Sequence, residues 1–169
     1  QASPTDVVPA DLAAVIEANL DLVTALGPSR GFIHGDCKIN NLLFHDDKDQ
    51  ALAVIDLDTV GPGHWAWDFG DLVRSVAFSH GSVELELFQA CVKGFSCGRG
   101  IFGQTAQITA QQMSIAPAYI AFTLGVRFLI DHLRGDEYFR VSQRGENLHR
   151  AAEQFTLLQQ FNGLRAQLF

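Results

Sequence analysis

Residues 31–58 read GFIHGDCKINNLLFHDDKDQALAVIDLD, and this stretch decides how the rest of the chain is interpreted. Apolar runs at 42–44 and 51–55 flank a polar segment at 45–50, which predicts two paired strands joined by a turn. A hairpin returns its second strand beside its first, so Asp56 would come back next to the loop that carries Asp36 and Asn41. We therefore expect three oxygen-bearing side chains to converge at this point.

Two carboxylates and an amide at one point suit the transfer of a phosphoryl group from a nucleotide to a hydroxyl. The acceptor hydroxyl needs a carboxylate that orients it and takes its proton, and Asp36 is predicted to do this. Mg²⁺ prefers oxygen ligands and commonly takes only one or two from the protein, which fits Asn41 and Asp56. Lys38 would place a positive charge near the transferred phosphate. His34 is expected to brace the loop backbone.

The spacing in this loop is more specific than its residue types. Asn41 lies five residues after Asp36, as in the kinase catalytic loop H-R-D-x-x-x-x-N, and an Ile-Asp at 55–56 supplies the metal carboxylate one hairpin later. Together, HGDCKINNLLF, AVIDLDTVGPG and WDFGDLVR resemble the aminoglycoside phosphotransferase and choline kinase-like family. The resemblance covers most of the chain. It implies ATP as co-substrate, Mg²⁺ as the metal and a mainly helical α+β fold, the C-terminal lobe of the protein-kinase-like fold, with a small β-hairpin carrying the catalytic loop.

Asp68, Phe69 and Gly70 spell the D-F-G of protein kinases, but the metal is not assigned to them. They follow a loop rich in Gly, Pro and Trp and open an apolar-periodic segment, so Asp68 is predicted to cap the N-terminus of a helix. The resemblance gives Asp68 another task, support of the catalytic loop, and gives the metal to Asp56. Asp58 is a further supporting candidate, because alternation along a strand would point it away from Asp56 unless the strand has ended.

A second, less specific resemblance covers residues 124–139, LGVRFLIDHLRGDEYF. The segment is similar to the N-acetylhexosamine 1-kinase-like sugar kinase branch of the same family, in which an arginine and a tyrosine contact the sugar. Arg127 and Tyr138 stand at the matching positions, and both side chains suit a hydroxylated ligand. Two structural alternatives stay level with this one: Arg127 neutralising a buried aspartate, and Tyr138 packing in the core. A sugar is the preferred acceptor, with aminoglycosides, choline-like amines and homoserine-like alcohols behind it.

The composition indicates a globular domain that handles small molecules. The 169 residues are 47% hydrophobic and 18% charged, with a formal net charge of −7. Because no Lys/Arg run is present, nothing favours binding to nucleic acid or an anionic membrane. Cys37, Cys91 and Cys97 show no spacing typical of zinc sites or of a disulfide framework. With no signal peptide visible, we expect a cytoplasmic protein.

Apolar periodicity predicts helices at 9–26, 68–79, 82–94, 107–134 and 147–164, with a glycine-rich connector at 96–107. Pro117 is expected to kink or divide the fourth helix, and Gly135 to end it. The longest apolar segment, 115–130, contains Arg127 and is shorter than a membrane span, so it should be a buried helix. We expect a single lobe over residues 1–169.

Features that hold a nucleotide in kinases of this kind are missing from the sequence. It contains no Gly-rich covering loop, and none of Lys38, Lys48 and Lys93 lies in a strand ahead of the catalytic loop. We therefore expect an N-terminal nucleotide lobe as a partner, and little activity from this chain alone. Two alternatives stay open. One is a non-catalytic, kinase-like binding module, and the other is a metal-dependent phosphohydrolase, which would need the ligands of a two-metal site.

Overall fold

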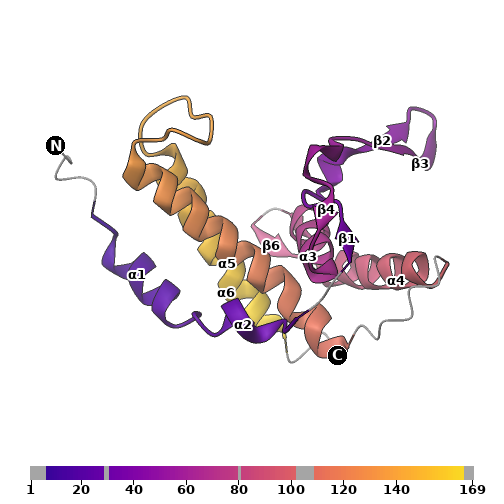
Figure 1. Cartoon of the computed structure of the whole chain (residues 1–169), viewed down its shortest axis with the longest axis horizontal. Helices are drawn as coiled ribbons and strands as arrows, with labels where there is room; N and C mark the ends of the chain where they lie inside the picture. Colours follow the sequence, from indigo (N-terminus) through magenta and orange to yellow (C-terminus); the bar gives the residue numbers. More distant parts are fainter. Residues whose placement is uncertain (1–6, 29–30, 80, 102–108, 166–169) are drawn as a thin grey trace.

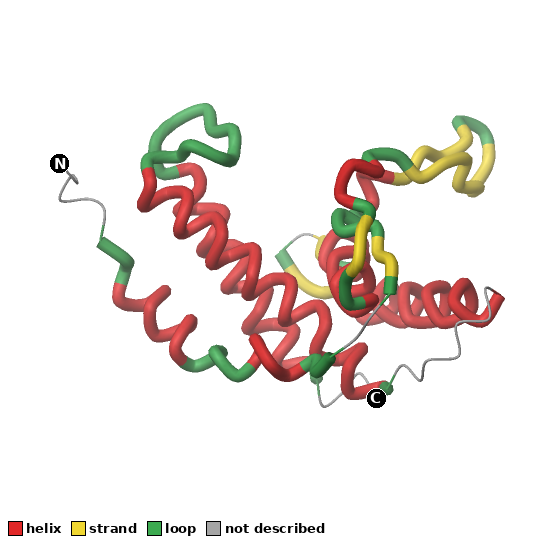
Figure 2. Tube along the Cα trace, in the orientation of Figure 1, coloured by secondary structure: helices red, strands yellow, loops and turns green. Residues whose placement is uncertain are grey.

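The computed structural model describes residues 7–28, 31–79, 81–101 and 109–165, and in these ranges the chain is mainly helical with small antiparallel hairpins (Figure 2). The predicted mainly helical α+β class is confirmed. The helices are α1 (Ala10–Glu17), α2 (Leu22–Ala25), α3 (Trp65–Val76), α4 (Leu85–Ile101), α5 (Ala110–Arg134) and α6 (Glu146–Leu164), with 3-10 turns η1 (Ile39–Asn41) and η2 (Leu57–Thr59). The strands are β1 (Phe32–Ile33), β2 (Leu42–His45), β3 (Lys48–Val54), β4 (Gly61–Pro62), β5 (Phe78–Ser79) and β6 (Ser82–Val83).

The hydrophobic core lies where α3, α5 and α6 pack together, with α5 and α6 side by side along most of their length (Figure 1). Gly70 lets α3 approach α5 closely, because a Cβ there would lie 2.4 Å from the Ala116 carbonyl oxygen. This packing fixes the position of α3, the helix that contacts the loop at 34–41. Side chains with less than 2% exposure include Phe69, Val73, Leu158 and Phe161.

Helix α5 is a single element of 25 residues, opened by a capping box of Thr109 and Gln112 and ended by Gly135 at φ 104°. The predicted buried helix and its stop at Gly135 are confirmed. The helix continues through Pro117 without division, since that ring is fully buried and packing on both sides outweighs the missing amide donor. By length and composition α5 could span a membrane, but it packs against α3 and α6 as a core helix does.

The predicted helix at 9–26 is two helices, α1 and α2, with a turn at 18–21 between them. Asn19 explains the break, because its Nδ2 donates to the Val15 carbonyl oxygen at 2.8 Å and competes with the backbone there. Its Oδ1 accepts a hydrogen bond from Asn162 of α6 at 2.9 Å. The turn is therefore held by the last helix.

Strands β2 and β3 form the predicted hairpin, which projects away from the helices (Figure 1). Its turn is shorter than predicted, since β3 begins at Lys48 and only Asp46 and Asp47 connect the strands. Leu42 pairs with Val54, which places the end of β3 beside the start of β2. A second strand pair, β1 with β4, was not predicted, and the loop at 34–41 begins directly after β1.

Helix α3 begins at Trp65, three residues before the predicted start, and its N-cap is His64, whose Nδ1 accepts from the Ala66 amide at 3.1 Å. The prediction that Asp68 caps this helix is therefore wrong. The imidazole of His64 accepts the hydrogen bond from an amide at the start of the helix, a role that the prediction gave to the Asp68 carboxylate. Asp68 lies inside the first turns of α3, where its side chain is free for another use.

Helix α4 departs from its prediction at both ends. It begins at Leu85, after the β5–β6 pair, and continues to Ile101. The predicted connector at 96–107 is thus helical as far as residue 101, because the helix tolerates Gly94 and Gly98 in its interior, and the remainder lies outside the described residues. Helix α6 matches its predicted range within one residue.

Candidate active site

The loop at 34–41 is held from below by α3. Asp68 Oδ2 accepts from the His34 amide at 2.7 Å, and Asp68 Oδ1 accepts from the Gly35 amide at 2.9 Å. Further along the loop, the Ile39 amide donates to Ser75 Oγ at 2.9 Å. A single carboxylate and a hydroxyl of one helix thus fix the backbone around Asp36.

Gly35 is required by the backbone at this point. Its φ is 81°, and a Cβ would lie 2.7 Å from the Thr59 carbonyl oxygen. The close approach lets Thr59 Oγ1 donate to the His34 carbonyl oxygen at 2.7 Å. The position that carries arginine in the H-R-D motif therefore has no room for a side chain here.

The His34 ring links the loop to the end of β3. Its Nδ1 accepts from the Asp36 amide at 3.3 Å, and its Nε2 lies 3.0 Å from the Ile55 carbonyl oxygen. A neutral ring with the proton on Nε2 satisfies both contacts. His34 therefore connects the loop to the end of β3, a position that suits a residue expected to brace the loop backbone.

The Asp36 carboxylate has one fixed oxygen and one open oxygen. Oδ2 accepts from Lys38 Nζ at 2.5 Å and from Asn41 Nδ2 at 3.0 Å, while Oδ1 accepts nothing from the described part of the chain. Burial alone raises the pKa of Asp36, but the hydrogen bonds from Lys38 and Asn41 outweigh it and hold that pKa below its ordinary value. Asp36 is therefore ionised at neutral pH.

Asp56 follows β3 in a left-handed conformation, with φ 62° and ψ 56°. The Ile55 amide donates to the Asn41 carbonyl oxygen at 2.9 Å, so the backbone brings Asp56 beside the loop. Its side chain is exposed and has no hydrogen bond to the described residues. Asn41 is 6% exposed and uses its Nδ2 on Asp36, which leaves its Oδ1 as a ligand atom. One carboxylate and one amide oxygen fit a hard cation such as Mg²⁺.

Asp58 and Cys37, which lie close in sequence to Asp56 and Asp36, have different environments from those two residues. Asp58 lies exposed in η2, after β3 has ended, so strand alternation does not apply to it, and Thr59 makes the contact to the loop. The Cys37 thiol is partly buried, and this burial, together with Asp68 and other carboxylates, raises its pKa to about 12. Cys37 is therefore a neutral packing residue at physiological pH.

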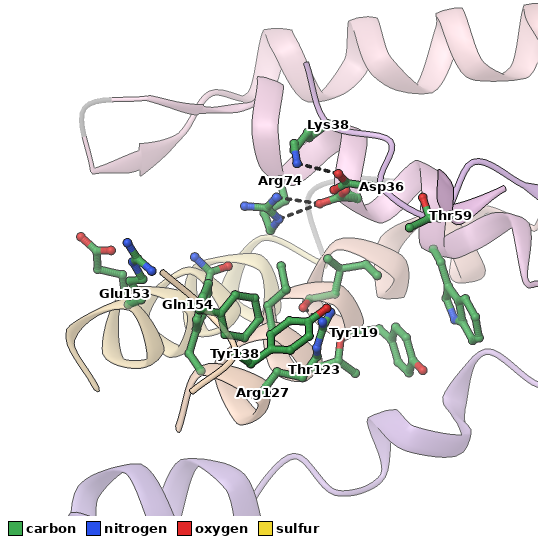
Figure 3. A pocket seen from close by; sticks show the side chains of 18 residues that line it. Asp36, Lys38, Thr59, Arg74, Tyr119, Thr123, Arg127, Tyr138, Glu153 and Gln154 are labelled. Atoms are coloured by element: carbon green, nitrogen blue, oxygen red, sulfur yellow. Dashed lines mark hydrogen bonds and ion pairs between the residues drawn. The ribbon is translucent and has the colours of Figure 1, made fainter. Parts of the chain in front are cut away.

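A cavity of about 610 Å³ opens beside Asp36, within the size range of small-molecule sites (Figure 3). Asp36 and Lys38 lie on one side, and Arg127 and Tyr138 lie on the opposite side. Asn41 and Asp56 do not line it. The structure thus gathers the predicted base and the predicted acceptor residues around one space. The remaining lining includes Thr59, Trp67, Asp71, Arg74, Tyr119, Phe139, Arg150, Glu153 and Gln154.

Arg127 lies over two aromatic rings, with its guanidinium carbon 5.8 Å from the centre of Tyr138 and 5.3 Å from the centre of Phe139. It forms no ion pair with a carboxylate of the described residues. Tyr138 is 75% exposed. Both structural alternatives are therefore wrong: Arg127 does not neutralise a buried aspartate, and Tyr138 is not in the core.

The sequence places Arg74 on a helix, where it could pair with a carboxylate near the loop or lie exposed on the surface, and the structure shows the pair. Arg74 Nε and Nη2 donate to Asp71 Oδ1 at 3.0 and 2.6 Å, and Asp71 is 8% exposed. Asp71 itself was not predicted as the partner, although the three-residue interval between Asp71 and Arg74 makes them neighbours on a helix surface.

The chain matches one family model, described as the phosphotransferase enzyme family, over residues 2–90. The matched stretch contains the loop, the β2–β3 hairpin, Asp56 and Asp68, and so all of the predicted catalytic and metal-binding residues. Arg127 and Tyr138 lie beyond it.

Proposed function

The chain belongs to the phosphotransferase enzyme family, and from this premise we propose that it carries the catalytic loop of a small-molecule kinase. The reaction is transfer of the terminal phosphoryl group of ATP to a hydroxyl, with Mg²⁺. One observation carries the proposal: Lys38 and Asn41 fix one oxygen of Asp36, and the carboxylate borders a cavity of about 610 Å³. A carboxylate held in this way can meet an incoming hydroxyl in one orientation.

In the proposed mechanism the acceptor hydroxyl donates to Asp36 Oδ1, which accepts no hydrogen bond from the described residues. Asp36 orients the hydroxyl and takes its proton as the new P–O bond forms and the bond from the terminal phosphorus to the bridging oxygen of ATP breaks, which releases ADP. Lys38 lies within reach to offset negative charge on the transferred group. Asp68 keeps the loop backbone in place through the His34 and Gly35 amides.

Asn41 and Asp56 would hold Mg²⁺, through one amide oxygen and one carboxylate. When bound, the ion neutralises charge on the nucleotide phosphates. In the described part of the chain no three His, Cys, Asp or Glu side chains gather as a metal-binding group, so most of the ligands would come from water and nucleotide. This ligand set suits a kinase better than a two-metal phosphohydrolase.

We propose a sugar as the acceptor, as in the N-acetylhexosamine 1-kinase-like branch. The support is the wall opposite Asp36, where Arg127 and Tyr138 offer donors and an apolar ring face. Arg127, which forms no ion pair with the described residues, favours hydroxyl or acyl oxygens over the cationic groups of choline or aminoglycosides. A homoserine-like alcohol stays behind the sugar in this ranking.

The proposal also includes a cytoplasmic location and an N-terminal lobe that helps to hold the nucleotide. Cys37, Cys91 and Cys97 are free thiols, as suits a reducing compartment. Because the described residues include no strand lysine ahead of the loop, we assign the remaining nucleotide contacts to that lobe.

ADP release by the full-length protein with a panel of sugars, aminoglycosides, choline and homoserine tests the proposal. We expect sugar-dependent release that Asp36→Asn removes and that Asp47→Asn, in the exposed hairpin turn, leaves unchanged. Release that does not depend on an acceptor would favour a phosphohydrolase. Failure to bind nucleotide and Mg²⁺ at millimolar concentration would favour a non-catalytic binding module.

A further inference from the structure

The chain between α5 and α6 is organised around one buried carboxylate. Asp131, in the last turn of α5, is 5% exposed. Its Oδ1 accepts from the amides of Glu137 and Tyr138 at 3.1 and 2.8 Å, and its Oδ2 accepts from the Phe139 amide at 3.0 Å. Three consecutive amides of the loop therefore point at one side chain.

Asn147 of α6 completes this arrangement and is itself fully buried. Its Nδ2 donates to Asp131 Oδ2 at 2.8 Å and to Asp136 Oδ1 at 2.9 Å. Its Oδ1 accepts from Arg150 Nη1 at 3.1 Å, and Arg150 lines the cavity. Asn147 thus ties the loop, α5 and α6 together, and we call Asp131 and Asn147 the loop clamp.

Charge and backbone geometry both depend on the loop clamp. Burial alone raises the pKa of Asp131, but the amides of Phe139, Tyr138 and Glu137 outweigh it and hold that pKa below its ordinary value. The loop turns through two left-handed residues, Gly135 at φ 104° and Asp136 at φ 61°. A non-glycine residue is costly in this conformation, and the Asn147 contact to its side chain offsets that cost.

Burial does not fix the position of Tyr138. Its side chain is 75% exposed, and its ring meets the Phe139 ring edge-on with 4.8 Å between the ring centres. The Phe139 ring in turn packs on Phe128 of α5 with 4.5 Å between the ring centres. Both loop rings line the cavity and lie under Arg127. Because the Tyr138 ring has so little contact of its own, its place on the wall is set by its backbone, which the loop clamp holds.

We propose that Asp131 and Asn147 are positioning residues for the acceptor, which place the Tyr138 and Phe139 wall opposite Asp36 and so set acceptor affinity and selectivity. The inference rests on the proposed function. Neither residue lines the cavity, so Asp131 acts through the loop, and Asn147 acts through the loop and through its contact with Arg150. Loosening the loop clamp should weaken acceptor binding and spare the nucleotide and the chemical step.

Asn147→Asp is the sharpest variant, because it keeps the side-chain shape but replaces the shared donor by an oxygen facing two carboxylates. Gln143→Glu adds the same charge on the exposed part of the same loop and is the matched control. In the full-length protein we expect Asn147→Asp to raise the acceptor KM by about tenfold or more. We expect kcat, the nucleotide KM and all constants of Gln143→Glu to stay within about twofold. Equal effects of the two variants, or an equal rise in both substrate KM values, would overturn the proposal.

A double-mutant cycle with Tyr138→Ala separates positioning from general destabilisation. The exposed Tyr138 side chain can be removed without disturbing the core, and its loss should also raise the acceptor KM. If the loop clamp acts through Tyr138, adding Asn147→Asp to Tyr138→Ala should change the acceptor KM by less than about threefold. Fully multiplied effects would contradict this. Should Asn147→Asp not fold, the isosteric Asp131→Asn takes its place in the cycle.

Hydrogen exchange gives a readout that does not require turnover. The amides of residues 137–139 should exchange faster in Asn147→Asp than in Gln143→Glu, while the amides of 34 and 35 keep their rates. Unchanged exchange at 137–139 would overturn the loop clamp even if the enzyme is a kinase. If no acceptor is phosphorylated at all, the proposed function fails, and faster exchange at 137–139 would still support the loop clamp as the device that holds this wall.

Discussion

Two loops face each other across the cavity, and each loop is held by an aspartate that accepts hydrogen bonds from its backbone amides. Asp68 of α3 accepts hydrogen bonds from two amides of the loop at 34–41, and Asp131 of α5 accepts hydrogen bonds from three amides of the loop at 137–139. The first loop presents groups that can react, with Asp36 at its centre. The second presents rings and lies outside the stretch that matches the family. Similar anchoring therefore serves different tasks, so substitutions on the first side should lower kcat and those on the second should raise the acceptor KM.

The largest expected effect on the catalytic side is that of Asp56→Ala. The variant loses the only carboxylate assigned to Mg²⁺, so turnover should fall below detection while acceptor binding persists. Calorimetric titration of Mg²⁺ with nucleotide, on the full-length protein, measures the loss. Asp58→Ala, two residues on and also exposed, is the control. Normal metal affinity in Asp56→Ala would contradict the assignment.

Asp36→Asn comes next. It preserves size and removes the proton acceptor, so kcat should fall by about 10²–10⁴-fold. The acceptor KM should change little, because the wall at 137–139 is untouched. Steady-state kinetics on the full-length protein test both constants. A variant that keeps more than about a tenth of the wild-type kcat would exclude Asp36 as the base.

Asp68→Asn breaks the anchor of the catalytic loop. The amide group presents a donor where the loop needs an acceptor, so the His34 or Gly35 amide is left without a partner and the free energy of unfolding should fall by about 1–3 kcal/mol. Urea unfolding with an unchanged m-value measures this. Asp58→Asn, on the exposed η2, should unfold as the wild type does. An Asp68→Asn protein of wild-type stability would show that α3 does not hold the loop.

The smallest effect is on the pH dependence of stability. The pKa of Asp131 is lowered in the folded chain, so its stabilising contribution is complete above the unfolded pKa of about 3.9 and is lost as pH falls through the folded value. Asp131→Asn should therefore show a shallower loss of stability below about pH 4 than the wild type. Urea unfolding of both proteins between pH 2 and 7 tests this. Equal slopes would mean that Asp131 does not gain charge stabilisation on folding.

The placement of Asp36, Asn41 and Asp56 around one loop was predictable because its signals are local. The five-residue spacing of Asp36 and Asn41 and the hairpin that returns Asp56 can be read within 28 residues of sequence. The long helices α5 and α6 followed from apolar periodicity in the same way. These features depend on neighbours along the chain, and sequence patterns report such neighbours well.

Features that depend on partners far along the chain did not follow from local patterns, and the support of the loop by Asp68 was expected from the family resemblance alone. His64 took the capping role expected of Asp68, and that left Asp68 free to reach loop amides 33 and 34 residues away in sequence. Asn19 ended α1 partly through a contact with Asn162. Asp131 carried no visible signal, because three of the four hydrogen bonds to its carboxylate come from backbone amides, which almost any residue type supplies.

The three cysteines of this chain differ in their expected reactivity toward thiol-specific labels. Cys37 has a pKa of about 12, and burial also raises the pKa of Cys91, so neither thiol supplies much thiolate to a maleimide at neutral pH. Cys97 is exposed on α4. Of the three cysteines of this chain, Cys97 should therefore be the one that a fluorescent dye labels, without any engineered cysteine.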